Sequence, residues 1–139
     1  MIVLDTNVLS EVFRPRPDPQ VVRWLENLTG DVAVTAVTVG KLLAGVQRLP
    51  DGRRKWDLRS GIDTVLRSYR NSRAILPFDA AAAEHYATIL SARESAGSPI
   101  GTADAQIASI CRANSAICAT RNTRDFAGTG VELINPWMA

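Results

Sequence analysis

Short apolar runs alternate with longer amphipathic stretches along the whole chain. Each apolar run is too short for a helix and is bounded by polar or turn-forming residues, which is typical of buried strands. Strands that alternate with helices favour right-handed crossovers, a mainly parallel sheet and helices on both faces. The sequence therefore predicts a three-layer α/β/α sandwich with a five-stranded sheet, its strands at Ile2–Leu4, Asp31–Thr35, Ala74–Phe78, Ser115–Thr120 and Val131–Asn135.

Capping residues mark where the intervening helices begin. Ser, Thr and Asp accept hydrogen bonds from free N–H groups in the first helical turn, and proline is tolerated at the first helical position. We expect six helices: Asn7–Phe13, one opened by Asp18-Pro19 to Leu28, one opened by Thr35 or Thr38 to about Leu49, a basic helix after Asp51-Gly52 to about Arg70, one capped by Asp79 to about Ala96, and one capped by Thr102 to about Ala113.

The chain has 139 residues, of which 46% are apolar and 22% are charged, as in a packed globular protein. No linker or repeat divides it, so a single domain over residues 1–139 is expected. No apolar stretch approaches the roughly 20 residues needed to cross a bilayer. No basic segment precedes an apolar run at the start, and Cys111 and Cys118 lack a CxxC spacing. We expect reduced thiols and a cytoplasmic protein without membrane contact.

The net charge of +2 conceals an uneven distribution. The segment from Arg48 to Arg73 holds eight basic and three acidic residues, a local charge of +5, and the remainder carries −3. Such a segment is typical of a surface that binds phosphates, and it is equally typical of a solvent-exposed helix face. Both interpretations stay open on charge alone.

Three aspartates follow elements whose ends meet at one edge of the predicted sheet. Asp5 ends the first strand, Asp104 lies in the first turn of a helix, and Asp125 follows the fourth strand. Each alone is explained by helix capping or by the preference of acidic residues for helix N-termini. Together they indicate a site for Mg²⁺ or Mn²⁺, which prefer carboxylate and water oxygens and bridge to phosphates.

Several other chemistries lack their sequence signature. The chain has no GxxxxGK loop, no GxSxG elbow and no GxGxxG turn, which argues against nucleotide hydrolysis, serine esterase chemistry and dinucleotide binding. Its one histidine, His85, lies in the middle of a predicted helix and is interpreted as a packing or surface residue.

An ordered set of motifs resembles the PIN-domain ribonucleases, specifically the VapC toxins and their FitB-like branch. The resemblance runs from Met1 to Trp137, and its terminal INPW makes it specific. It implies a metal-dependent endoribonuclease, the toxin of a toxin–antitoxin pair. It also implies a homodimer, a VapB-like antitoxin that covers the acidic groove and contacts operator DNA, and an RNA substrate of the tRNA or rRNA class. The motifs are MIVLDTNVLSE, TAVTVGKLLAGV, ILPFD, GTADAQIA, ATRNTRDF and INPW.

The resemblance also assigns roles to individual positions. Asp5 matches the first metal-binding aspartate of the family, and Asp104 matches the aspartate of its third motif. Asn122 stands where relatives often have an aspartate, so Asp125 is expected to supply the missing charge. Thr6, Asn7 and Thr120 are expected to orient these carboxylates through hydrogen bonds.

Lys41 departs from the family pattern, which places a glutamate at this position of VTVGKLLAGV. The exchange changes the local charge by two units and replaces an oxygen acceptor with an ammonium donor. Three explanations are compatible with the sequence: an inactivating substitution, natural or introduced; a natural variant with weak activity through Asp5, Asp104 and Asp125; or a shifted alignment. Glu11, the nearest spare carboxylate, is expected on the helix surface or at a dimer contact.

Two further functions are compatible with the residues. The first is a non-catalytic PIN-fold module that binds antitoxin and RNA without turnover, with the basic helix contacting phosphates. The second is an aspartyl-phosphate phosphohydrolase, because LDTN follows a strand, but Asn7 occupies the second acidic position of that motif.

Overall fold

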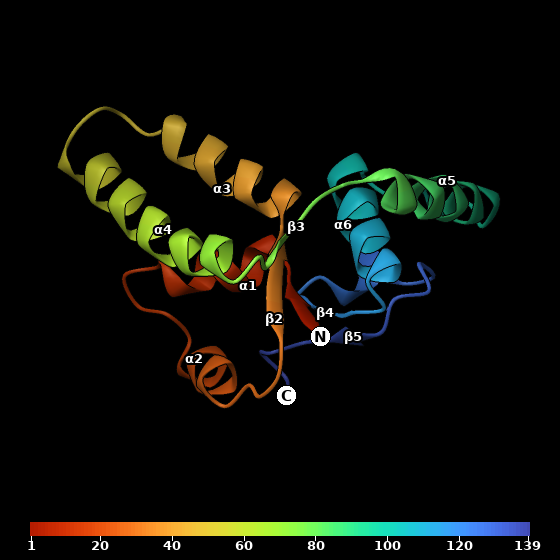
Figure 1. The fold of residues 1–139 in the computed structure, drawn as a ribbon, viewed down its shortest axis with the longest axis horizontal. Coiled ribbons are helices and arrows are strands. Elements are labelled where there is room, and N and C mark those ends of the chain that lie inside the picture. The colour runs from red at the N-terminus through yellow and green to blue at the C-terminus, as the bar shows by residue number, and fades with distance from the viewer.

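The computed structural model describes residues 1–139, and all five strands and six helices expected from the sequence are present (Figure 1). A short 3₁₀ helix, η1, is added between the last two strands. In chain order the elements are β1 (Ile2–Leu4), α1 (Thr6–Val12), α2 (Pro19–Glu26), β2 (Val32–Thr35), α3 (Ala36–Gln47), α4 (Arg53–Asn71), β3 (Ile75–Leu76), α5 (Ala80–Ser95), α6 (Thr102–Ala113), β4 (Ile117–Ala119), η1 (Thr123–Phe126) and β5 (Leu133–Ile134).

The five strands form one sheet in the order β3-β2-β1-β4-β5, and every neighbouring pair is parallel. The predicted parallel sheet is therefore confirmed. β1 is the central strand: Val3 pairs with Ala33 of β2 on one side and with Cys118 of β4 on the other. β3 is shorter than predicted, because Pro77 has no N–H to extend the ladder.

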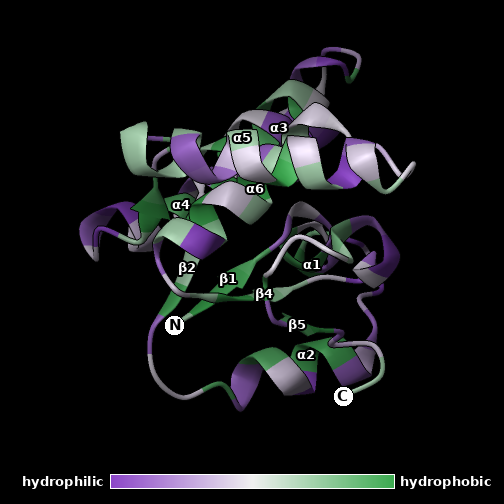
Figure 2. Ribbon diagram, turned by 90° about the vertical axis from the view of Figure 1, so that its right-hand side faces the viewer, coloured by the Kyte–Doolittle hydropathy of each residue, from purple (hydrophilic) through white to green (hydrophobic).

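Successive side chains of β1 enter two different cores, one on each face of the sheet. Val3 packs with Ile107 and Phe126 under α5 and α6. Leu4 packs with Leu42 and Ile62 under α1, α3 and α4. Figure 2 shows β1 as apolar along its length, as expected for a strand covered on both faces. The three-layer arrangement predicted from the sequence is thus present, and it directs the carboxyl ends of all strands to one edge.

Most of the predicted caps are in place. Asp18, Thr35 and Asp79 each accept a hydrogen bond from a backbone N–H of the helix that follows. The prediction for Thr102 is wrong by one position, because α6 has Gly101 as its N-cap and no side-chain cap. No helix combines the length and apolar character that crossing a membrane would require.

A buried arginine fastens the loop that follows β4. The Arg93 side chain on α5 is only 8% exposed. Its guanidinium donates hydrogen bonds to the carbonyl oxygens of Ser98 at 2.6 Å, Asp125 at 2.8 Å and Ala127 at 2.9 Å. Arg93 therefore joins α5, the α5–α6 connection and η1 through one side chain.

Replacing Arg93 with methionine, which retains the apolar stem, should lower the free energy of unfolding by about 3 kcal/mol. The physical reason is that several carbonyl acceptors would lose their partner inside the protein. Urea unfolding measures this change. The matched control is Arg23→Met on the exposed side of α2, expected within about 0.5 kcal/mol of the unchanged chain. Equal stabilities of the two variants would contradict the role given to Arg93.

Candidate functional site

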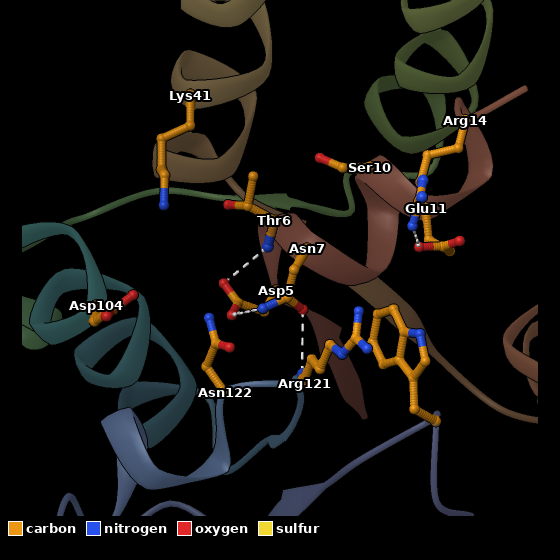
Figure 3. A pocket seen from close by; sticks show the side chains of 11 residues that line it. Asp5, Thr6, Asn7, Ser10, Glu11, Arg14, Lys41, Asp104, Arg121 and Asn122 are labelled. Carbon is orange, nitrogen blue, oxygen red and sulfur yellow. Dashed lines mark hydrogen bonds and ion pairs between the residues drawn. The ribbon is translucent and has the colours of Figure 1, made fainter. Parts of the chain in front are cut away.

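A groove of about 350 Å³ lies at the edge where the carboxyl ends of β1 and β4 meet (Figure 3). Asp5 enters it directly after β1, and Arg121 and Asn122 enter it from the chain after β4. Lys41 reaches it from α3 and Asp104 from the first turn of α6. The groove thus lies where open parallel sheets usually bind their ligands.

The Asp5 carboxylate is buried in the groove, and the residue is only 3% exposed. Its Oδ1 accepts a hydrogen bond from the backbone N–H of Thr6 at 2.8 Å. Its Oδ2 accepts from the Thr120 hydroxyl at 2.8 Å and from the Asn7 amide at 3.3 Å. The three residues expected to orient the carboxylates therefore all contact Asp5. The capping interpretation of Asp5 also holds, since it is the N-cap of α1.

The same network fixes the loop after β4. Asn7 Oδ1 accepts a hydrogen bond from the backbone N–H of Arg121 at 3.2 Å. Thr120 Oγ1 accepts from the backbone N–H of Asn122 at 3.0 Å. The position of Asn122 in the groove is thus tied to that of Asp5 through two side chains.

Burial raises the pKa of both groove aspartates, and the charge of Asp5 adds to the rise at Asp104. For Asp5, the loss of solvent raises the pKa most, and the hydrogen bonds from Thr120 and Thr6 offset part of the rise. For Asp104, the loss of solvent again comes first and the charge of Asp5 second. Lys41 lowers the pKa of both carboxyl groups. The two aspartates and Lys41 therefore form one electrostatic unit.

Lys41 extends from α3 into the groove on the side of Asp104 (Figure 3). It takes part in none of the four ion pairs of the structure, so its ammonium has no carboxylate within 4.0 Å. Its helix is held against α1 by hydroxyl groups: Thr6 Oγ1 lies 3.1 Å from Thr38 Oγ1, one turn before Lys41. The groove thus receives an ammonium at the position where the resemblance implies a carboxylate.

Asp125 does not join the other two aspartates. Asn122 lines the groove and is the N-cap of η1, whereas Asp125 lies three residues later on η1 and is exposed. The backbone carbonyl of Asp125 is held by Arg93, on the side of α5. Asp125 acts on Asp5 and Asp104 only through its charge, which raises the pKa of both. Asp125 therefore does not line the groove beside Asn122 in this structure.

The donor set of this groove does not fit a divalent metal ion. No three Asp, Glu, His or Cys side chains lie close enough together to hold one. Asp5 and Asp104 are the only aspartates of the groove, Asn122 is neutral, and Lys41 adds a positive charge. Because Mg²⁺ and Mn²⁺ require several oxygen ligands with net negative charge, the expected three-aspartate site is not built in this chain.

The position of Glu11 differs from the one expected from the sequence. It was expected on a surface or at a dimer contact, but it is 3% exposed and lines the groove. Its carboxylate accepts hydrogen bonds from the backbone N–H of Asp18 at 2.9 Å and from Arg14 at 3.1 Å. Glu11 thus closes the loop between α1 and α2. The three-residue spacing to Arg14, just before the prolines that break the helix, was the available signal.

Sequence analysis also missed a stacked pair at the rim of the groove. The guanidinium carbon of Arg121 lies 4.9 Å from the centre of the Trp137 ring, and both residues line the groove. Motif reading assigned Trp137 only to the terminal INPW. Its contact with Arg121 depends on β4 and β5 being neighbours in the sheet, which single motifs do not reveal.

Comparison with known proteins agrees with this fold. The family model described as PIN domain matches residues 2–131. The chain therefore belongs to the PIN-domain family.

Individual relatives match over nearly the full length. The chain is 41% identical over 138 residues to Toxin FitB of Neisseria gonorrhoeae, covering 99% of each. It is 35% identical over 138 residues to VapC ribonuclease Y4jK of Sinorhizobium fredii, covering 99% of this chain and 98% of that protein. The solved structure of FitAB bound to an IR36 DNA fragment aligns with a TM-score of 0.92 and 40% identity, covering 99% of this chain and 96% of that one.

Replacing Asp104 with asparagine should raise the free energy of unfolding at neutral pH by roughly 0.5 kcal/mol, a small gain because the half-exposed side chain is screened by solvent. The folded state raises the pKa of Asp104, so its charged form costs stability above the ordinary value of 3.8. The gain should disappear as the pH falls below that value, where both states bind the proton. Urea unfolding across this pH range measures the effect.

The matched control is Asp31→Asn, a substitution at an exposed position outside the groove. It should show no comparable gain. A loss of stability for Asp104→Asn at neutral pH, or a gain that persists below 3.8, would contradict the electrostatic account of the groove.

Proposed function

We propose that this chain is the toxin component of a toxin–antitoxin pair, built on a metal-dependent endoribonuclease fold, in which Lys41 impairs RNA cleavage. The observation that carries the proposal is the groove itself. Asp5, Asp104 and Asn122, which come from three motifs of the family resemblance, all line it. The ammonium of Lys41 faces the carboxylates of Asp5 and Asp104. The full-length similarity to FitB and to a VapC ribonuclease supports the assignment.

The same relatives support the partners we propose. FitAB is described as bound to DNA, which favours a VapB-like antitoxin that covers this chain and contacts operator DNA. RNA of the tRNA or rRNA class is the proposed substrate, a homodimer the proposed assembly, and the cytoplasm the proposed location. The RNA class and the homodimer are what the family resemblance implies, and a relative 29% identical over 136 residues, a tRNA(fMet)-specific endonuclease VapC of Shigella flexneri, supports the former.

The impairment follows from charge. A nuclease of this kind uses Mg²⁺ or Mn²⁺ to activate water and to neutralise charge on the phosphate. With glutamate at position 41, a further carboxylate would face Asp5 and Asp104 beside the Asn122 amide. With lysine, Asp5 and Asp104 face an ammonium instead, which disfavours a metal cation between them by direct repulsion.

A non-catalytic module that binds antitoxin and RNA without turnover is the second candidate. The absence of a three-carboxylate cluster favours it over weak residual cleavage. The two candidates differ only in whether the unchanged chain has measurable metal-dependent activity. The aspartyl-phosphate alternative has no support in the groove, because Asn7 donates its amide to Asp5 and Thr120 and its carbonyl is used by Arg121.

Replacing Lys41 with glutamate should raise Mg²⁺- or Mn²⁺-dependent RNA cleavage by about 100-fold or more, because it restores the third carboxylate. Cleavage of total tRNA and of a structured rRNA fragment by purified protein measures this. Lys41→Gln is the matched control: it removes the ammonium without adding a carboxylate and should gain much less. Adding Asp5→Ala to the Lys41→Glu variant should abolish the gain.

If the unchanged chain is fully active and Asp5→Ala abolishes that activity, the proposed impairment by Lys41 is wrong and the assignment as a nuclease stands. No cleavage by Lys41→Glu with either metal and either RNA would overturn the nuclease assignment.

A further inference from the structure

Two cations of the groove have no carboxylate partner. Arg14 is paired with Glu11 at 3.1 Å, but Lys41 and Arg121 belong to none of the ion pairs. They enter from different elements, α3 and the loop after β4, and both line the same groove. Two positive groups held on a rigid scaffold, each with free N–H donors, form a potential anion site.

Arg121 is held in a way that leaves its donors available. Its guanidinium lies over the face of Trp137 at 4.9 Å, and its backbone N–H is fixed by Asn7. The ring holds the guanidinium by a cation–π contact, and no carboxylate lies within 4.0 Å of its N–H groups. The side chain is therefore positioned in advance for a bidentate contact with a phosphate.

The groove aspartates do not cancel these cations. Both oxygens of Asp5 already accept hydrogen bonds, from Thr6 on one side and from Thr120 and Asn7 on the other, and the residue is 3% exposed. Lys41 lies close enough to Asp5 and Asp104 to lower the pKa of both, so it offsets part of their negative potential. Lys41 and Arg121 are the groove cations without a carboxylate within 4.0 Å, whereas Arg14 is paired with Glu11.

The cations continue beyond the groove. A second hollow of about 300 Å³ shares Thr6, Ser10, Arg14 and Lys41 with the first, so the two are continuous. Arg54 of α4 lines it, over an apolar floor that includes Phe13 and Ile62. A line of cations over two adjoining hollows suits a chain of phosphates with bases between them better than a single carboxylate.

We infer that the groove binds the phosphates of single-stranded RNA without any metal ion, through Lys41 and Arg121. The built-in ammonium and guanidinium supply the two positive charges that a divalent ion would otherwise bring to the phosphate. This inference rests on the proposed function for its choice of RNA, and it explains how a chain unable to hold the metal still holds the nucleic acid.

The test is fluorescence anisotropy with a labelled, unstructured RNA of about 12 nucleotides, in buffer containing EDTA and in buffer containing Mg²⁺. The unchanged chain should bind equally well in both. Lys41→Ala and Arg121→Ala should each weaken binding about tenfold, and each should reduce the salt dependence by about one phosphate contact. Arg23→Ala, outside both hollows, is the matched control and should change neither. Lys41→Glu should bind RNA weakly in EDTA and more tightly with Mg²⁺.

Loss of binding in EDTA by the unchanged chain, or Lys41→Ala and Arg121→Ala variants that bind like Arg23→Ala, would overturn the inference. Tighter binding of labelled poly-glutamate than of the RNA, in EDTA and at equal charge concentration, would also overturn it, in favour of an acidic peptide. If Arg121→Ala unfolds, Arg121→Lys replaces it; this variant keeps the charge, loses the planar stack and should bind more weakly than the unchanged chain. The proposed function is tested by RNA cleavage in the presence of metal, and this inference by RNA binding in its absence. Either proposal can therefore be contradicted while the other stands.

Discussion

The buried carboxylate of Asp5 is the interaction on which the groove depends. It directly follows the central strand, caps α1 through the backbone N–H of Thr6, and accepts hydrogen bonds from Thr120, just after β4, and from Asn7 of α1. One side chain thus joins β1, α1 and the chain after β4. These donors offset part of the pKa rise that burial causes, and they hold the carboxylate in a fixed orientation at the carboxyl end of the sheet.

Lys41 changes what this fixed carboxylate can do. The hydroxyls of Thr38 and Thr6 hold α3 against α1, so the ammonium is presented to the same space that Asp5 and Asp104 face. A pair of carboxylates whose charges repel is suited to a cation, and here the chain supplies that cation itself. In the function that we propose for this chain, this internal charge takes the place of the external metal ion.

The sequence was sufficient for the fold and for the principal groove residues. Apolar periodicity and caps predicted every strand and helix, because these signals are local. Asp5, Asp104 and Lys41 were predicted because they follow recognisable motifs. The roles of Glu11 and Asp125 were not predicted, because both depend on how connecting loops fold back on the sheet. The carboxylate of Glu11 accepts a hydrogen bond from the loop before α2, and Arg93 holds the backbone carbonyl of Asp125 on the side of α5.

Direct titration of the purified chain with Mn²⁺ by calorimetry tests the central claim without relying on any substrate. The account predicts no saturable binding by the unchanged chain at millimolar Mn²⁺, and one or two sites in the Lys41→Glu variant that are lost again on Asp5→Ala. Saturable binding of Mn²⁺ by the unchanged chain, abolished by Asp5→Ala, would show that the groove holds the metal despite Lys41 and would contradict the account.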